Sequence, residues 1–541
     1  MIRSTLFARS MLSARCVLFV FPLIAASAGL IITDAEAKTL RYASQDDPQT
    51  LDPHSANLLP TNRVLSQVYE GLVGRDKNFK LVPGLAVSWS QPDVKTWRFK
   101  LRSNVKFHEG QTLVADDVVF SVERALHPLS QLKSSLQGVA GAKKVDNLTV
   151  DLTMKEPNPV LLNHLFQFRI ISKEWAVKNK AEVPQNYKDG EDTYASRNTN
   201  GTGPFKVTLR QADVKTTLVA NPDWWNKSSP EKGNLTQVDL LPVKSNATRA
   251  AALLSGEVDF VLDPPPQDIA RLKGNPNIKI LEGTEARFQY LAFDSNRSEL
   301  LYSDVKGKNP LKDVRVRQAI AHAIDVEAIK EKVMRGLAVP TGSLVSPGVQ
   351  GYHKDADKRY AFDKDKARKL LAEAGYPNGF GITLDCGNIQ PASDICQAIP
   401  PMLSQVGIRA TPNIVPQATY FPKIQKFDTS MYLLSWGAAT YDALYNLQLL
   451  LHTSTGDNTG LGDSNYGRYS NPKMDALIAR IRVETDLKKR DAIIREALLL
   501  SNSEVAILPI HQPLVPWAMR KNVEATFAPN NVAYFFRFKL N

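Results

Sequence analysis

The sequence predicts an α/β protein built from at least two lobes. A chain of 541 residues is too long for one ordinary hydrophobic core. Trp97, Phe99 and Leu101 alternate with basic residues, which is the period-two pattern of a strand with one buried face. Asp116 and Asp117 then precede an apolar run at helical spacing, where acidic groups favour a helix N-terminus.

The N-terminus predicts export. Three arginines precede an apolar run over residues 17–32, and Ala35, Glu36 and Ala37 follow it. A basic front, a short apolar centre and a small-residue end describe a secretory signal peptide cleaved after Ala37. The alternative is a membrane anchor, but the run contains Pro22 and is shorter than the ~20 residues that a span needs. We therefore expect residues 1–37 to be removed and the protein to be periplasmic.

Composition and charge narrow the range of partners. The chain is 43% hydrophobic and 23% charged, which is typical of a soluble globular protein. Its formal net charge is +12, but the basic residues are scattered among acidic ones without a basic run. An exported protein with this pattern is not expected to bind nucleic acid.

Two cysteines remain after removal of the leader. Cys386 follows an apolar stretch typical of a strand, and Cys396 follows Asp394, which is placed to open a helix. In an oxidising compartment the pair either closes a disulfide or persists as two buried thiols. Because no further Cys or His stands nearby, neither alternative makes a metal site. No metal or other cofactor is predicted.

The rest of the chain alternates strand and helix patterns. Apolar residues recur at every second position in the strands and at helical spacing in the helices. The expected elements are a strand at 40–42, a helix at 61–70, a hairpin around 145–152 with a helix from about 159, a helix at 248–254, a strand at 288–292, helices at 313–324 and 363–371, and a strand at 431–434.

Several phrases carry a resemblance to a known family. They are PGLAVSW, TWRFKLRSNVKFHEG and ADDVVFSVERAL in residues 83–126, GTGPF from residue 201, and NPLKDVRVRQAIAHAID from residue 309. In this order they resemble the family 5 solute-binding proteins of ABC importers, which include oligopeptide-, dipeptide-, nickel- and opine-binding proteins.

The resemblance implies a fold and a division of the chain. It implies a two-lobed periplasmic-binding-protein fold, class II, of the large three-subdomain type with two hinge crossings. Lobe I is expected over residues 38–283, with an inserted subdomain at about 76–200. Lobe II is expected over residues 284–508, and residues 509–541 are expected to return to lobe I.

The resemblance also points to ligand-binding residues. In such proteins the loop before the first helix lines the ligand cleft, which brings Asn57 and Asn62 towards it. A tryptophan beside the ligand matches Trp436, and the acid that holds a peptide's ammonium stands three residues later. Ala439 occupies that position here. Because a buried ammonium needs a compensating charge, either the nearby Asp442 replaces the acid or the ligand is something else; Tyr441 in the same stretch is a further candidate.

Arg169 is a separate candidate. Aromatic and branched residues flank it, and burying an unpaired charge is costly. It is either a carboxylate-binding arginine in a cleft wall or a partly exposed arginine on an amphipathic edge. In the nickel-binding branch of the family an arginine at the matching place faces the ligand, which favours the first alternative.

Three classes of function remain for comparison. A receptor would bind a peptide or peptide-like solute, or an opine, glycoside or nickel chelate, and deliver it to the permease subunits and cytoplasmic ATPase subunits of an importer. A secreted hydrolase is disfavoured because the chain lacks H-E-x-x-H and G-x-S-x-G, so no catalytic residue is predicted. A chaperone or sensor on the same fold is the third class. The resemblance favours a monomeric receptor that is not an enzyme.

Overall fold

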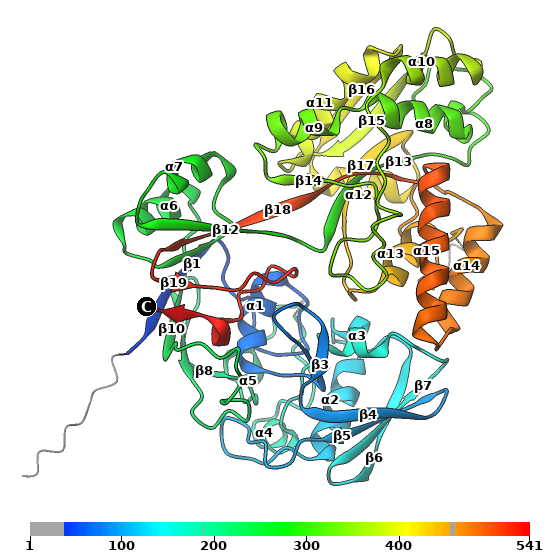
Figure 1. Ribbon diagram of the computed structural model, residues 1–541. Coiled ribbons are helices and arrows are strands. Elements are labelled where there is room, and N and C mark those ends of the chain that lie inside the picture. The colour runs from blue at the N-terminus through cyan, green and yellow to red at the C-terminus, as the bar shows by residue number, and fades with distance from the viewer. Residues whose placement is uncertain (1–36, 188, 455–459) are drawn as a thin grey trace, which may run out of the picture. The chain divides into compact units, whose positions relative to one another are not determined.

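One mixed β-sheet organises much of the chain (Figure 1). The computed structural model describes residues 37–187, 189–454 and 460–541, so the predicted signal peptide lies outside the described residues except for Ala37. Within the described residues the sheet has twelve strands, in the order β16-β15-β17-β13-β18-β11-β1-β10-β9-β8, with β12 and β14 also paired to β18.

The strands of this sheet come from almost the whole length of the protein. They are β1 (Thr39–Ser44), β8 (Phe205–Gln211), β9 (Lys215–Ala220), β10 (Gln237–Pro242), β11 (Phe260–Leu262), β12 (Ile278–Thr284), β13 (Arg287–Phe293), β14 (Ala338–Pro340), β15 (Phe380–Gly387), β16 (Ile408–Val415), β17 (Met431–Gly437) and β18 (Leu508–Arg520).

The long strand β18 connects the two ends of the sheet. Its first residues pair with β13 and β14, and its last residues pair with β11 and β12 (Figure 1). The change of partner falls at residues 511–514 of β18 and at 284–287 between β12 and β13. The family resemblance predicts the crossings between lobes close to these stretches, after residue 283 and after residue 508.

A second, four-stranded sheet carries the alternating stretch identified in the sequence. Its order is β4 (Ala86–Asp93), β5 (Thr96–Leu101), β7 (Thr149–Met154) and β6 (Val139–Asp146). Trp97, Phe99 and Leu101 are buried, which confirms the predicted face. The adjacent helix starts at Ala115, where the Asp117 carboxylate accepts a hydrogen bond of 2.9 Å from the Val114 N–H.

Two of the predicted helices begin at an aspartate N-cap. Asp313 and Asp363 each accept a backbone N–H at the start of a helix, as an N-cap should. The helices are α1 (Leu59–Val68), α2 (Ala115–Leu126), α3 (Leu161–Leu165), α4 (Lys173–Lys178), α5 (Tyr194–Arg197), α6 (Asn246–Ser255), α7 (Ile269–Lys273), α8 (Val314–Ala323), α9 (Val326–Ala328), α10 (Lys364–Glu373), α11 (Ala392–Ser404), α12 (Gln417–Gln425), α13 (Ala443–Leu450), α14 (Pro472–Val483) and α15 (Leu487–Glu504).

The first helix differs from its predicted bounds of 61–70. It starts two residues earlier because Pro60 occupies its first turn, where a missing N–H costs nothing. It ends at Val68 because Tyr69 is extended. Glu70 therefore lies beyond the helix, and this places its side chain beside the cavity described below.

The remaining strands form two small hairpins. They are β2 (Val73–Arg75) with β3 (Leu81–Pro83), and β19 (Val523–Glu524) with β20 (Lys539–Leu540). Phe535, Phe538 and Leu540 near the C-terminus share a hydrophobic core with β1, β10 and α1. The C-terminal residues thus pack against elements from the N-terminal part of the described chain.

A disulfide links a strand to a helix. Cys386 lies in β15 and Cys396 in α11, and their sulfur atoms are bonded across a sequence separation of ten residues. Both cysteines are fully buried. Across the described part of the chain, no helix is long and apolar enough to cross a membrane.

Candidate functional site

A cavity of about 780 Å³ is lined by segments that lie far apart in the sequence. Its wall includes α1, the β2–β3 hairpin, and residues 166–169 and 224–231. The lining also includes the end of β17 with the loop that follows it, residues 285–287, residues 529–537, Pro204, Phe421, Tyr445 and Tyr466. The volume is within the range of small-molecule sites, which is about 300–1,000 Å³.

Aromatic side chains form much of the cavity wall. The Trp436 and Tyr445 rings stack with centroids 5.9 Å apart, and Trp224 meets Phe536 edge-on at 5.2 Å. Such rings offer a large apolar contact area together with indole and phenol hydrogen-bonding groups. The aromatic lining residues are Tyr69, Phe166, Trp224, Trp225, Phe421, Trp436, Tyr441, Tyr445, Tyr466, Tyr534 and Phe536.

Arg169 is a buried cation in this wall. Its side chain is 8% exposed, and its Nη2 donates a hydrogen bond of 2.9 Å to Oδ1 of Asn62. Asn62 in turn donates to Oδ1 of Asn57 at 2.9 Å. Burial lowers the pKa of the guanidinium to about 10. Because no described acidic side chain forms an ion pair with Arg169, it is suited to receive an anion.

Arg75 is a second lining cation. Its guanidinium lies over the rings of Phe79, Phe166 and Tyr441, at 4.9, 5.1 and 4.9 Å from their centroids. It donates to the Phe79 carbonyl at 2.7 Å and to Asn163 Oδ1 at 3.1 Å. Burial lowers its pKa to about 10. Three aromatic faces stabilise this charge in place of a direct ion pair with a described acid, and Asp442 and Asp76 favour it at longer range.

Glu70 is the most enclosed of the lining acids. Its carboxylate accepts hydrogen bonds from the indole N–H groups of Trp224 and Trp225, at 3.0 and 2.9 Å, and from the Thr202 hydroxyl at 2.8 Å. Burial raises its pKa to about 7, although the three donors favour the charged form. These bonds fix both tryptophans in the cavity wall.

The other lining acids also have partners. Glu231 pairs with Arg537 at 2.9 Å, and Glu285 lies 3.5 Å from Arg287. Asp76 accepts backbone N–H groups from residues 78 and 80. Burial raises the pKa of Glu285, and Arg287 opposes that rise. Each carboxylate of the described lining therefore has a hydrogen-bond or ion-pair partner, whereas two lining arginines, Arg75 and Arg169, form no ion pair with a described acid.

The unpaired polar atoms of the lining are of one kind. Among the described lining residues, buried side-chain atoms without a hydrogen-bond partner are Nε of Arg75, Nη1 of Arg169 and Nε1 of Trp436. All three are N–H donors, and leaving a buried donor unpaired costs about 1–3 kcal/mol. A solute rich in acceptor oxygens is the chemistry that complements this wall.

Five of the seven ligand-binding candidates from the sequence meet at the cavity. They are Asn62, Arg169, Trp436, Ala439 and Tyr441. The Ala439 carbonyl accepts a long hydrogen bond of 3.4 Å from Gln167, so residues of both chain halves touch there. Asn57 is exposed and is not among the described lining residues; it reaches the site through its hydrogen bond to Asn62.

Asp442 occupies a different environment. Its side chain is fully buried, and both carboxylate oxygens accept hydrogen bonds of 2.8 Å from Arg490. It also caps α13 by accepting from the Leu444 N–H. Asp442 is not among the described residues of the cavity lining. Its charge is already compensated, so we no longer expect it to replace the acid missing at Ala439.

The cavity lining also contains residues that the sequence analysis does not identify, namely Glu70, Arg75, Trp224, Trp225 and Arg287. Two adjacent indole N–H groups need acceptors if they are buried, and that requirement was the available signal for the tryptophans. Arg75 and Glu70 carry no comparable pattern, because only tertiary burial distinguishes them from surface charges.

Comparison with known proteins decides the family. The profile for bacterial extracellular solute-binding proteins, family 5 Middle, matches residues 80–458. The chain belongs to this family. One relative, heme-binding protein A of Haemophilus influenzae, is 27% identical to this protein over 83% of this chain and 82% of its own length. The dipeptide-binding protein of Escherichia coli is 28% identical over 91% and 93%.

Further relatives and solved structures agree. The glutathione-binding protein GsiB of Shigella boydii is 28% identical over 90% of each chain. The structure of HbpA2 from Haemophilus parasuis superposes with a TM-score of 0.79 at 26% identity, covering 93% of this chain and all of the other. The unliganded open form of the murein tripeptide-binding protein MppA gives 0.78 at 23% identity, over 94% and 98%. These likenesses confirm the α/β, two-lobed binding-protein fold predicted for this family-5 protein.

Proposed function

We propose that this family-5 protein is the solute-receiving component of an ABC importer and that it binds a peptide or peptide-like solute bearing a carboxylate. The single observation that carries the proposal is Arg169, a buried guanidinium in the wall of a large cavity with no described acidic partner. A carboxylate would give this charge a bidentate partner inside a site that excludes water.

The size and lining of the cavity support a peptide-like solute. A volume of about 780 Å³ accommodates a short peptide, and aromatic faces suit side chains of varied shape. Relatives that span nearly the whole chain are named for dipeptide and glutathione binding. Glutathione is itself a peptide with two carboxylates, which fits a wall whose unpaired groups are N–H donors.

The charges of the cavity disfavour a free ammonium as the main recognition element. Each described lining carboxylate already accepts bonds from an arginine, an indole or backbone N–H groups. Ala439 offers no charge, and Asp442 is paired with Arg490. The same chemistry would admit a carboxylated solute that is not a peptide, such as an opine or the chelator of a nickel complex; no cluster of metal-ligating side chains exists in the described residues.

Lobe closure is the mechanism that we propose for capture. The lining contains residues on both sides of the crossings at 284–287 and 511–514. Asn163 donates to Gln350 at 3.0 Å, and Gln167 donates to the Ala439 carbonyl, so the two chain halves already touch beside the cavity. Closing around a solute removes water and strengthens the arginine–carboxylate contact.

The cellular setting follows from the same proposal. The protein would be exported, cleaved after Ala37 and released into the periplasm as a monomer. It would act as a binder rather than an enzyme and would hand its solute to permease subunits that are driven by cytoplasmic ATPase subunits.

Isothermal titration calorimetry of the mature protein tests this function. Alanine di-, tri- and tetrapeptides and reduced glutathione serve as probes, each with its carboxylates free and with them blocked as amides or esters. We expect at least one free acid to bind at least ~10-fold more tightly than its blocked form, since a charge-assisted bond contributes about 1.5–3 kcal/mol. Equal affinity for both forms would contradict carboxylate recognition, and binding of none would contradict peptide capture.

A further inference from the structure

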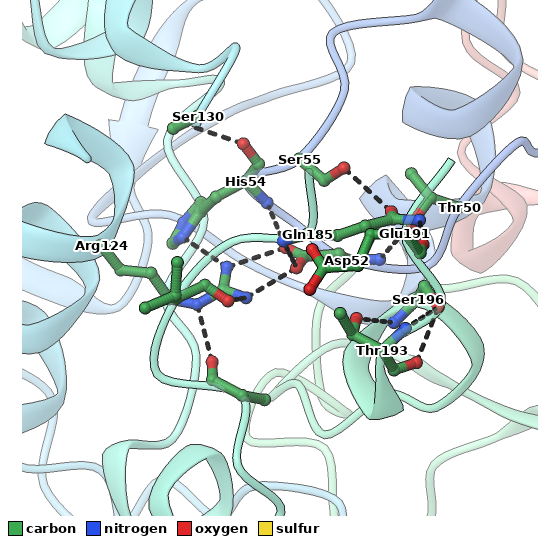
Figure 2. Close-up of polar contacts among 12 residues, drawn as sticks. Thr50, Asp52, His54, Ser55, Arg124, Ser130, Gln185, Glu191, Thr193 and Ser196 are labelled. Carbon is green, nitrogen blue, oxygen red and sulfur yellow. Dashed lines mark hydrogen bonds and ion pairs between the residues drawn. The ribbon is translucent and has the colours of Figure 1, made fainter. Parts of the chain in front are cut away.

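Asp52, His54, Arg124 and Gln185 form a buried polar network (Figure 2), and His54 links it to the backbone of Arg169. Asp52 and Arg124 form a fully buried ion pair in which two guanidinium N–H groups donate to the carboxylate at 2.7 and 2.6 Å. Gln185 donates its backbone N–H to the same carboxylate at 3.0 Å. The lining of the cavity does not include this pair, so the pair can affect a bound solute only through neighbouring residues.

His54 connects the network to Arg169. Its Nδ1 lies 3.2 Å from Nη1 of Arg124, and its Nε2 lies 2.9 Å from the carbonyl oxygen of Arg169. The ring is fully buried and stacks on Phe168 with an interplanar angle of 9°. One histidine side chain therefore contacts Arg169 and the residue before it.

The neighbours of His54 determine its tautomer. A guanidinium can only donate, so Nδ1 must be the acceptor, and Nε2 must carry the hydrogen that it donates to the Arg169 carbonyl. Burial and the nearby Arg124 charge lower the pKa of His54 to about 3, which keeps the ring neutral at neutral pH. The direction of both hydrogen bonds is consequently fixed.

The backbone on the other side of Arg169 is held as well. The Ile170 N–H donates to the Glu70 carbonyl at 2.9 Å. The side chain, in contrast, donates to Asn62, and its Nη1 has no acceptor among the residues that the structure describes. Hydrogen bonds thus hold the backbone on both sides of the Arg169 side chain, while the Nη1 donor of its guanidinium has no described acceptor.

We infer that His54 is a positioning residue for Arg169, holding its backbone so that the guanidinium meets the carboxylate of the solute. The inference rests on the proposed function for the identity of the solute, but not for the geometry of Arg169. Preorganisation of this kind raises affinity by reducing the ordering cost on binding. His54 touches no solute and acts through the arginine.

Two replacements of His54 separate positioning from general packing. His54→Phe keeps a ring to stack on Phe168 but removes the donor to the Arg169 carbonyl. His54→Gln keeps an N–H donor near the position of Nε2 but removes the ring. Ser55→Ala is the matched control, because the Ser55 hydroxyl donates to Gln185 in the same buried network.

The first readout needs no solute. Phenylglyoxal, an arginine-selective reagent, is applied to the ligand-free protein, and modification of Arg169 relative to the partly exposed Arg98 is followed by peptide mass spectrometry. We expect His54→Phe to accelerate modification of Arg169 about fivefold, the factor for one lost hydrogen bond. His54→Gln and Ser55→Ala should remain within about twofold of the wild-type protein.

The second readout is affinity for whichever free-acid peptide the wild-type protein binds, together with its blocked form. His54→Phe should lower the affinity for the free-acid peptide about fivefold and the affinity for the blocked peptide less. His54→Gln should bind the free-acid peptide about as tightly as the wild-type protein. Unchanged Arg169 reactivity in His54→Phe, or equal acceleration in Phe and Gln variants, would overturn the inference. If the wild-type protein binds no peptide, the proposed function fails while the reagent experiment still decides the role of His54.

Discussion

Asp442 and Arg490 form an ion pair whose side chains are 0% and 1% exposed, although 48 residues separate them in the chain. Two hydrogen bonds of 2.8 Å hold the pair. The Asp442 carboxylate therefore belongs to the packing beneath the loop of Trp436, and its removal should affect folding before it affects binding.

Replacing Asp442 by asparagine should strongly destabilise the protein. Breaking a buried pair leaves an uncompensated charge and costs about 3–5 kcal/mol. Asp355→Asn is the matched control, because Asp355 pairs with Arg495 where both side chains are about half exposed and such pairs contribute at most about 1 kcal/mol. Urea unfolding measures both. If Asp442→Asn lowers the affinity for solute without lowering the stability of the protein, Asp442 contributes to binding and this account of its role is wrong.

Replacing Arg169 by methionine should selectively weaken acidic solutes. The variant removes the charge but keeps much of the apolar stem, so affinity for a free-acid peptide should fall about 10- to 100-fold. Affinity for the blocked peptide should change little. Arg98→Met serves as a control, because Arg98 pairs with Asp151 in the four-stranded sheet. Equal losses for both peptide forms would contradict a carboxylate contact.

Replacing Trp436 by alanine should weaken binding without unfolding the protein. The ring is half-buried, stacks on Tyr445 and lines the cavity. Loss of this aromatic surface should reduce affinity two- to tenfold, which corresponds to about 0.5–1.5 kcal/mol. Trp89→Ala removes a tryptophan of β4 that is also partly buried and should leave affinity unchanged. Calorimetry measures the affinity of both variants for the solute. Unchanged affinity in Trp436→Ala would show that Trp436 does not contact the solute.

Glu70 should impose a pH dependence on stability. Its pKa in the folded protein is raised from 4.5 to about 7, so between these values the native state keeps a proton that the unfolded state releases. Stability should fall by about 3 kcal/mol as pH rises through this window and level off above it. Glu70→Gln should lack this decrease in the plot of unfolding free energy against pH, even though the amide changes the overall stability. An unchanged slope in urea unfolding would contradict the raised pKa.

Local signals in the sequence predicted many of the elements. Asp313 and Asp363 precede apolar runs at helical spacing, and each carboxylate caps the helix that follows. The alternation around Phe99 likewise marks a strand with one buried face. These features depend on neighbours within a few residues, which is why a sequence reading reaches them.

The candidate site was less accessible to prediction. The family resemblance placed Trp436 and Arg169 at the cavity. The resemblance could not show that Asp442 forms an ion pair with Arg490, because that pair depends on how α15 packs against the loop that follows Trp436. Nor did any local pattern mark Arg75, whose charge is stabilised by rings contributed from residues 79, 166 and 441.

Native mass spectrometry of the protein released from its own periplasm tests the central claim most directly. The account predicts a polypeptide that begins at Lys38 and carries one or more bound solutes, each of which contains a carboxylate by tandem fragmentation. A series of short peptides would establish peptide capture, and a single small acid would establish a carboxylated non-peptide solute. A protein that retains residues 1–37, or that carries only solutes without an acidic group, would contradict the account.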